Sequence, residues 1–208
     1  MAALATTYQE QGKWREAKKL RLQVMEKRKI DLGTEHPETL DSMAALATTY
    51  RGRGRWDESE ELELQVIDIS KRVLGPKHPD TLTSMANLAE AYSSQYRWDE
   101  AEKLELQVRD ISKRVLGPEH PDTLVSMSNL AVTWKSRSKL HDISAALNLM
   151  EECLALRIKV LGSEHPDTIS TSRAVENWKH ELEQNISSRG GSLTPPTQIE
   201  PSQDLQDI

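Results

Sequence analysis

The chain repeats itself every 42 residues, and this period limits its fold more than any other feature of the sequence. The strings MAALATTY, MAALATTY, MANLAEAY and MSNLAVTW begin at residues 1, 43, 85 and 127. Residues 43–84 and 85–126 are identical at 30 of 42 positions. Repeats of about 20–50 residues indicate an elongated array in which each unit packs against its neighbours. We therefore predict a stack of similar units rather than a closed domain.

A nine-residue string separates the units: LGTEHPETL at 32–40, LGPKHPDTL at 74–82, LGPEHPDTL at 116–124 and LGSEHPDTI at 161–169. Gly117 suits a C-terminal αL cap, because glycine tolerates positive φ. Pro121 suits the first turn of the next helix, where its missing N–H is not needed, and Asp122 favours the positive end of that helix. We place the histidine at or just before the N-cap.

Each unit contains two helical patterns. In the third unit the apolar face of the first helix consists of Leu82, Met85, Leu88, Ala89 and Tyr92. The second helix, after Trp98, offers Ala101, Leu104, Val108, Ile111 and Val115. The last spacing between boundary strings is 45 residues, and we place the three extra residues in the helix–helix turn near 136–144. Only 4% of the residues are aromatic, which argues against a β-sandwich or barrel.

The pattern x-L-A-x-x-Y…G-x-W-x-E-A resembles the tetratricopeptide repeat. Its small residues are Ala47, Ala89 and Ala131 in the first helices, and Ala17, Ser59 and Ala101 in the second. The 42-residue period is similar to that of the kinesin light chain subclass, and closer still to repeat arrays of fungal nucleotide-binding, receptor-like (NLR-type) proteins. The resemblance covers about residues 1–184. It implies an all-α, right-handed α-solenoid of about four helix–turn–helix units plus a C-terminal capping helix.

We predict units at about 1–36, 37–78, 79–120 and 121–165, a cap helix at 166–183 and a disordered tail at 185–208. Glu176 and Lys179 replace the small and aromatic residues of the other first helices, which suits a helix that carries no further unit. The tail has the Ser, Gly, Pro and Gln bias of disorder. The first unit lacks the HPDTL start, so we read the chain as a piece or a shortened descendant of a longer array, and we expect this unit to fray first.

The resemblance also implies a concave groove lined by the first helices. It places the groove positions at Ala44, Ala45, Thr48, Arg51, Ala86, Asn87, Glu90, Ser93, Ser128, Asn129, Val132 and Lys135. Asn87 and Asn129 hold positions at which family members contact the backbone of a bound peptide. An amide supplies both a donor and an acceptor for this purpose. The alternative for both asparagines is a solvated polar face.

Other conspicuous residues have both a structural and a functional interpretation. His36, His78, His120 and His165 cap helices or ligate a metal, and we favour capping, because equivalent positions of stacked repeats lie about 10 Å apart, too far to share one ion. Trp14, Trp56 and Trp98 fill a corner beside the turn or form a stacking platform, and we favour the corner. We interpret Cys153 as a small buried apolar residue rather than a nucleophile. Glu61, Glu63, Glu102 and Glu105 predict a solvated acidic face on the convex side.

We therefore predict a non-enzymatic scaffold that binds an extended peptide or partner protein, without a cofactor or metal. The alternative is a fragment of the ligand-sensing or self-associating repeat region of a fungal receptor-like signalling protein. Self-association through the exposed first unit is a further possibility under either reading. The net charge of −6 argues against a nucleic-acid surface. A single cysteine and the lack of an apolar run of about 18 residues favour a cytoplasmic protein without membrane contact.

Overall fold

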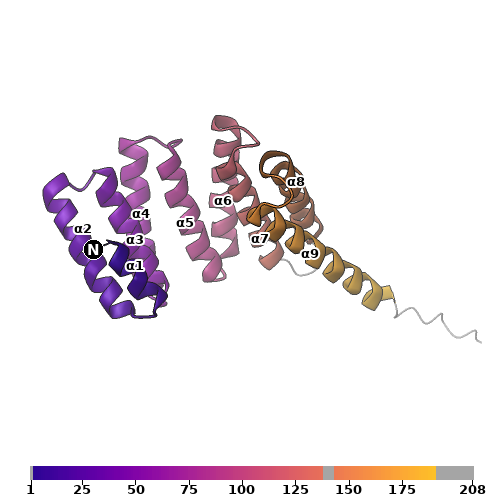
Figure 1. The fold of residues 1–208 in the computed structure, drawn as a ribbon, viewed down its shortest axis with the longest axis horizontal. Helices are drawn as coiled ribbons and strands as arrows, with labels where there is room; N and C mark the ends of the chain where they lie inside the picture. The colour runs from indigo at the N-terminus through magenta and orange to yellow at the C-terminus, as the bar shows by residue number, and fades with distance from the viewer. Residues whose placement is uncertain (1, 138–142, 191–208) are drawn as a thin grey trace, which may run out of the picture.

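The computed structural model describes the backbone of residues 2–137 and 143–190, and all regular structure in these two ranges is helical. Its helices are α1 (Ala2–Glu10), α2 (Trp14–Leu32), α3 (Pro37–Arg51), α4 (Trp56–Val73), α5 (Pro79–Ser94), α6 (Trp98–Val115), α7 (Pro121–Arg137), α8 (Ile143–Leu161) and α9 (Pro166–Gly190). The main contacts join each helix to the helices before and after it in the chain. Figure 1 shows the resulting row of stacked helices. The predicted all-α solenoid is confirmed.

A histidine caps the first helix of each unit that begins with the boundary string. Nδ1 of His120 accepts a hydrogen bond of 3.2 Å from the backbone N–H of Asp122. The same bond, also 3.2 Å long, is formed at the starts of α3, α5 and α9. It satisfies one of the N–H groups that lack a partner at a helix N-terminus. The predicted capping role is therefore confirmed.

The threonine of the boundary string ties each first helix to the end of the preceding helix. The fully buried hydroxyl of Thr123 donates to the carbonyl of Gly117 at 2.8 Å, and two equivalent bonds join Thr39 to Gly33 and Thr81 to Gly75. Gly117 has a φ of +95°, as predicted. At the equivalent Gly33, φ is +93° and ψ is 164°, so the backbone of that glycine is not in the αL region.

The fourth unit accommodates its three extra residues before α8. Helices α7 and α8 begin at residues 121 and 143, three residues farther apart than α5 and α6, which begin at 79 and 98. The interval from the start of a second helix to the start of the next first helix is unchanged. The insertion therefore lies between the starts of α7 and α8, an interval that includes the predicted turn, and residues 138–142 of that turn lie outside the described residues.

The core follows the predicted apolar faces with one exception. Leu82, Met85, Leu88, Ala89 and Tyr92 are all buried. In α6, Ala101 and Val108 are buried, and Leu104 and Ile111 pack against the same cluster. Val115 was predicted to continue this face and is exposed instead. The packed face of α6 runs through Glu105, Val108 and Ser112, and Val115 lies to one side of it.

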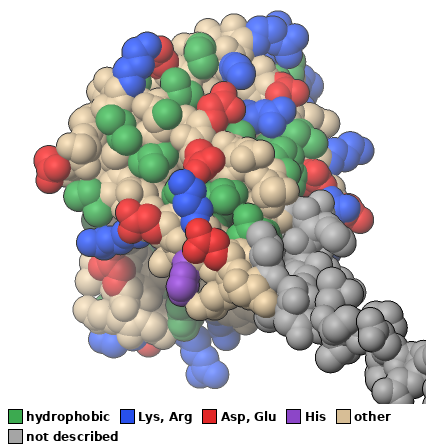
Figure 2. Space-filling view, turned by 90° about the vertical axis from the view of Figure 1, so that its right-hand side faces the viewer, with side chains coloured by type: hydrophobic (Ala, Val, Ile, Leu, Met, Phe, Trp, Pro, Cys, Tyr) green, Lys and Arg blue, Asp and Glu red, His purple; other side chains and the backbone are tan. Residues whose placement is uncertain are grey.

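The last helix is longer than predicted. Helix α9 continues to Gly190, seven residues beyond the expected end at 183, because no proline interrupts the chain before the two glycines at 190 and 191. Glu176 and Lys179 are exposed, and Lys179 pairs with Glu151 of α8 at 2.7 Å. Figure 2 shows hydrophobic side chains interspersed with acidic and basic ones at this end of the stack. The predicted tail beyond residue 190 lies outside the described residues.

Candidate peptide-binding groove

In the described part of the chain, three clefts lie between the first helices of successive units, from α1 to α7. Cleft I, about 200 Å³, is lined by Thr6, Arg21, Val24, Arg28, Asp41, Ser42 and Ala45. Cleft II, about 170 Å³, is lined by Pro37, Leu40, Asp41, Ala44, Val66, Ser70, Leu74, Asp80, Thr83, Ser84 and Asn87. Cleft III, about 200 Å³, is lined by Pro79, Leu82, Thr83, Ala86, Asn87, Glu90, Val108, Ser112, Leu116, Asp122, Val125, Ser126 and Asn129. Neighbouring clefts share residues, so together they form one surface, which we call the groove.

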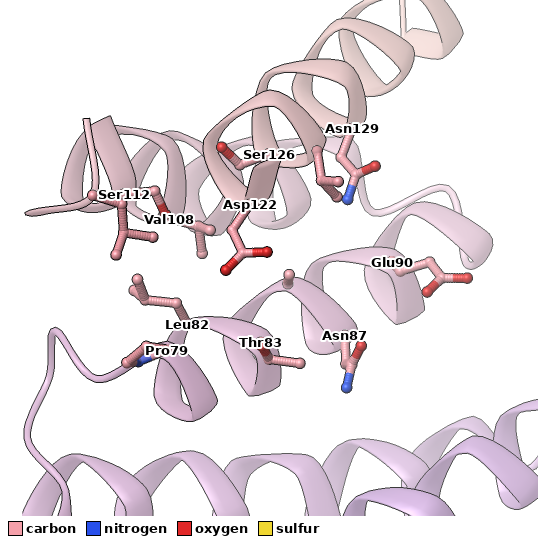
Figure 3. Close-up of a pocket in the computed structure, with 13 residues that line it drawn as sticks. Pro79, Leu82, Thr83, Asn87, Glu90, Val108, Ser112, Asp122, Ser126 and Asn129 are labelled. Atoms are coloured by element: carbon pink, nitrogen blue, oxygen red, sulfur yellow. The ribbon is translucent and has the colours of Figure 1, made fainter. Parts of the chain in front are cut away.

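Cleft III has an apolar floor and a polar rim. Leu82 of α5 and Val108 of α6 are buried and form part of the floor. In Figure 3, Asp122 and Asn129 point from α7 into the space between α7 and α5. Glu90 of α5 lies at one end of this space. The cleft can therefore take an apolar side chain between polar groups.

Half of the predicted groove residues line the clefts. They are Ala86, Asn87, Glu90 and Asn129 in cleft III, Ala44 in cleft II and Ala45 in cleft I. Thr48, Arg51, Ser93, Ser128, Val132 and Lys135 line none of the three.

Most of these six residues are engaged elsewhere in the stack. Arg51 donates to the backbone carbonyl of Asn87 at 3.1 Å and pairs with Glu90 at 3.2 Å. Lys135 pairs with a carboxylate of α9, and the Ser93 hydroxyl lies 3.2 Å from that of Thr133. Thr48 donates to its own helix. Ser128 was expected in the groove, but its hydroxyl contacts Sδ of Met150 at 3.6 Å and so faces α8. Val132 is exposed beside the groove.

Asn87 and Asn129 keep their side-chain amides available. Within the described residues, neither amide forms a hydrogen bond, although the structure places both beside the same cleft. Asn87 lies on the ridge between clefts II and III and lines both. Two unpartnered amides one repeat apart can each donate to and accept from an extended backbone.

Sequence reasoning missed the acidic and apolar part of the rim. Asp122, Val125 and Asn129 line cleft III at spacings of three and four on α7, so they share one face of that helix. Asp122 was assigned only to the helix terminus. Val125 and Asp122 precede Asn129 by four and seven residues, so both lie on the face of α7 that carries Asn129. This spacing would have identified them as groove residues.

The predicted acidic convex face is wrong for two of its four residues. Glu63 and Glu105 are only 2% and 6% exposed, whereas Glu61 is exposed. Glu63 and Glu105 lie at the interface with the first helix of the following unit. There, Glu105 accepts a hydrogen bond of 3.0 Å from Thr133 of α7. Burial raises the pKa of each carboxyl from 4.5 to about 7. Half-buried Glu102 accepts a hydrogen bond from Nε1 of Trp134 at 2.8 Å and pairs with Arg137.

The repeated tryptophans and Cys153 pack within the stack. Trp14, Trp56 and Trp98 begin α2, α4 and α6 and are half-buried. A Cβ on Gly52 would approach the Trp14 ring to 2.6 Å, so this ring fills the corner beside the turn. Cys153 is fully buried, its thiol donates to the carbonyl of Leu124 at 3.3 Å, and burial raises its pKa.

The described residues contain no group of three or more His, Cys, Asp or Glu side chains arranged to hold a metal ion. No helix in the described part of the chain is long and apolar enough to span a membrane. Self-association through the first unit is not tested by these contacts and stays a prediction.

The sequence comparisons identify the repeats. A family model described as tetratricopeptide repeat matches residues 1–72 and 46–114, and a second model with the same description matches residues 123–167. None of the curated proteins compared with the chain matches it.

Solved structures share the architecture. A Podosopora anserina protein of kinesin light chain type, with nearly identical TPR-like repeats, has a TM-score of 0.73 and 32% identity over 91% of this chain and 88% of its own. A point variant of that protein has a TM-score of 0.74 with the same identity and coverage. BtubC (BKLC) from P. vanneervenii has a TM-score of 0.71 over 99% of this chain and 85% of its own, and at 21% identity it shares the fold alone. The similarity to kinesin light chain-type repeats is confirmed, whereas a relationship to fungal receptor-like proteins stays a prediction.

Proposed function

Because this chain belongs to the tetratricopeptide repeat family, we propose that it is a non-enzymatic scaffold whose groove binds an extended peptide segment of a partner protein. Tetratricopeptide repeats mediate protein and peptide interactions in general. The proposal adds the place of binding and the form of the ligand.

The observation that carries the proposal is the pair of unpartnered amides of Asn87 and Asn129. They project beside a cleft whose floor is apolar, and Ala86 leaves room for a chain next to them. An extended peptide presents a backbone N–H and C=O at each residue, which matches what an amide offers. Side chains of the peptide on the cleft side would meet Leu82 and Val108, which supplies an apolar contribution to binding.

The size of the clefts favours a chain over a compact ligand. Each is about 170–200 Å³, below the roughly 300–1,000 Å³ of pockets for drug-sized molecules and cofactors. Because cleft II and cleft III share Thr83 and Asn87, a ligand that fills both must run along the stack. The two glutamates whose pKa is raised to about 7, Glu63 and Glu105, line none of the clefts, so the groove does not present them to a ligand.

The proposal is tested by affinity capture from cell extract with three baits. They are the wild type, the double variant Asn87→Ala and Asn129→Ala, and the control Gln65→Ala and Gln107→Ala. The control removes two exposed amides at the same 42-residue spacing from α4 and α6, outside every cleft. Circular dichroism verifies equal helicity, which alanine favours in all cases.

We expect a partner that the wild type and the control variant retain and the double asparagine variant loses. Each lost amide contact removes about 0.5–1.5 kcal/mol, so the double variant should bind about 5- to 150-fold more weakly. Equal recovery by all three baits would mean that the groove amides do not hold the partner, and the proposal would be wrong.

A further inference from the structure

Clefts II and III, in the middle of the groove, carry negative charge, and no basic side chain lines either of them. The residues lining clefts II and III include Asp41, Asp80, Glu90 and Asp122 and contain no lysine or arginine. Glu90 is paired with Arg51 at 3.2 Å. The three aspartates, by contrast, form no ion pair with a lysine or arginine among the described residues.

The histidines beside two of these aspartates do not neutralise them. Nδ1 of His78 and Nδ1 of His120 lie 3.7 and 3.8 Å from the carboxylates of Asp80 and Asp122. Each Nδ1 accepts a backbone N–H, so this nitrogen does not donate a hydrogen bond to the carboxylate. The helix N-termini supply about half a positive charge each, which leaves the carboxylates with a net negative field.

The pKa of Asp41 also reflects the negative charge of this part of the groove. Burial raises its pKa, and the next largest cause is the repulsion by Asp80 across cleft II. Two carboxylates that repel each other across an open cleft are stabilised by a cation placed between them.

The basic residues of the groove are confined to cleft I and are already engaged. Arg21 donates to the carbonyl of Ala45 and to the hydroxyl of Thr49, and Arg28 pairs with Glu38 at 3.0 Å. An acidic ligand would therefore meet occupied guanidinium groups at one end and repulsion along the rest of the groove.

We propose that the segment bound by clefts II and III is basic, with lysine or arginine side chains directed at Asp80 and Asp122 and an apolar side chain between them on the floor of cleft III. This proposal rests on the proposed function and specifies the chemistry of the partner. The apolar side chain would contact Leu82, Val108 and Val125. Complementary charge on the two sides steers association and fixes the register of the bound chain.

The test begins with selection of binders to the wild-type protein from a random nonapeptide display library. We expect the selected peptides to contain Lys and Arg about threefold above the library frequency and to be depleted in Asp and Glu. Enrichment of acidic residues, absence of charge bias, or absence of binders would each overturn the proposal. Selection makes no assumption about the spacing of the basic residues.

The strongest selected peptide is then measured by fluorescence anisotropy against matched variants. Asp80→Asn with Asp122→Asn should weaken binding about five- to tenfold and reduce its salt dependence. Asp68→Asn with Asp110→Asn removes the same charge at the same spacing from exposed positions of α4 and α6, and should change affinity less than about twofold. Equal effects of the two pairs would overturn the proposal.

Replacing Asp80 and Asp122 also changes the first turns of their helices, so a second variant tests the cleft without altering these aspartates. Val125→Lys places a cation in cleft III at a side chain that is 46% exposed, so the fold should not change. It should weaken the basic peptide at least about tenfold, whereas Val160→Lys, on exposed α8 surface, should not. No loss with Val125→Lys would place the peptide elsewhere and overturn the proposal.

The double asparagine variant separates this inference from the proposed function. If Asn87→Ala with Asn129→Ala abolishes binding while the aspartate variants do not change it, the groove binds a peptide but not through its charge. If only the charge variants weaken binding, the proposal of a basic ligand is supported, and the proposal that the two asparagine amides hold the peptide is wrong.

Discussion

Glu105 accepts a hydrogen bond of 3.0 Å from the hydroxyl of Thr133 across the buried interface between α6 and α7. Glu63 occupies the equivalent position of α4, but the equivalent of Thr133 in α5 is Ala91. Both carboxylate oxygens of Glu63 are buried without a hydrogen-bond partner among the described residues. Arg21 and Met150 hold the same position in the first and fourth units. The four units therefore place three kinds of side chain at this position: arginine in the first, glutamate in the second and third, and methionine in the fourth.

Replacing the unpartnered acid should stabilise the stack. We expect Glu63→Met to raise the free energy of unfolding at pH 8 by about 1–3 kcal/mol, because methionine avoids burying an unpaired charge and already fills this site in the fourth unit. Urea unfolding followed by circular dichroism measures the change. Glu105→Met should gain less, since it removes a partner of Thr133.

Glu61→Met is the control for this substitution. Glu61 lies two residues away on the exposed side of α4, so its replacement should change the free energy of unfolding by less than about 0.5 kcal/mol. Destabilisation by Glu63→Met would mean that the carboxylate has a partner that the structure does not include.

Stability should also depend on pH through the same two acids. A raised pKa means that folded Glu63 and Glu105 keep a proton between pH 4.5 and about 7, where the unfolded chain has lost it. The folded state then binds more protons, so the free energy of unfolding falls as pH rises through this window and is level above it. The stabilising contribution is fully present below pH 4.5.

The variant Glu63→Gln with Glu105→Gln isolates this effect. Relative to the variant, we expect the wild type to lose up to about 5 kcal/mol between about pH 5 and 8, about 2.5 kcal/mol for each acid. The charged groups that face the acids are Arg51, Glu60 and Glu90 near Glu63, and Glu102 near Glu105, and they are common to both proteins. Parallel pH curves for the two proteins would contradict the prediction.

A strained tyrosine offers a third test. Tyr96 has a φ of +62° and is 80% exposed, whereas its equivalents are Gly12 and Gly54, whose φ values are +71° and +68°. A side chain in this conformation costs about 1–2 kcal/mol. Part of that cost is offset by an edge-to-face contact with Trp98, with ring centroids 5.6 Å apart.

We expect Tyr96→Gly to raise the free energy of unfolding by about 0.5 kcal/mol and Tyr96→Val to lower it by about 1 kcal/mol. Valine loses the aromatic contact and is strongly disfavoured at positive φ. Thermal unfolding of the three proteins gives the order. Equal stability of Tyr96→Val and Tyr96→Gly would show that the strain is absent in solution.

The boundary string was predictable from sequence because its features are local. Glycine, histidine and proline act on their own helix ends, so His120 and Gly117 could be assigned without knowledge of the stack. The buried acids and half of the groove could not be predicted in this way. Whether Glu63 is exposed or buried, and whether Ser128 faces the groove or Met150, depends on how the neighbouring helices pack. An i, i+3, i+4 pattern identifies the apolar face of a helix, but it does not show whether a polar residue is buried in an interface.

The first unit should open before the others. Helix α1 has nine residues, against 15 to 17 in α3, α5 and α7. The buried apolar residues described for α1 and α2 are Ala5, Ala17 and Met25, while Ile30 is 82% exposed. With so few buried apolar side chains, the local opening free energy of α1 and α2 should be smaller than that of the later units.

Hydrogen exchange measured by mass spectrometry tests this expectation. Amides in residues 2–31 should exchange at least about tenfold faster than those in residues 85–126, which corresponds to about 1.4 kcal/mol less protection. Helix α9 serves as the internal comparison, because it places Val175 in a core with Leu130 and Met150. If residues 2–31 exchange as slowly as residues 85–126, the contacts of α1 with α2 suffice to hold the first unit. Fast exchange confined to residues 2–31, with Asn87 and Asn129 still protected in their helices, would mean that the groove around cleft III stays formed while the first unit opens.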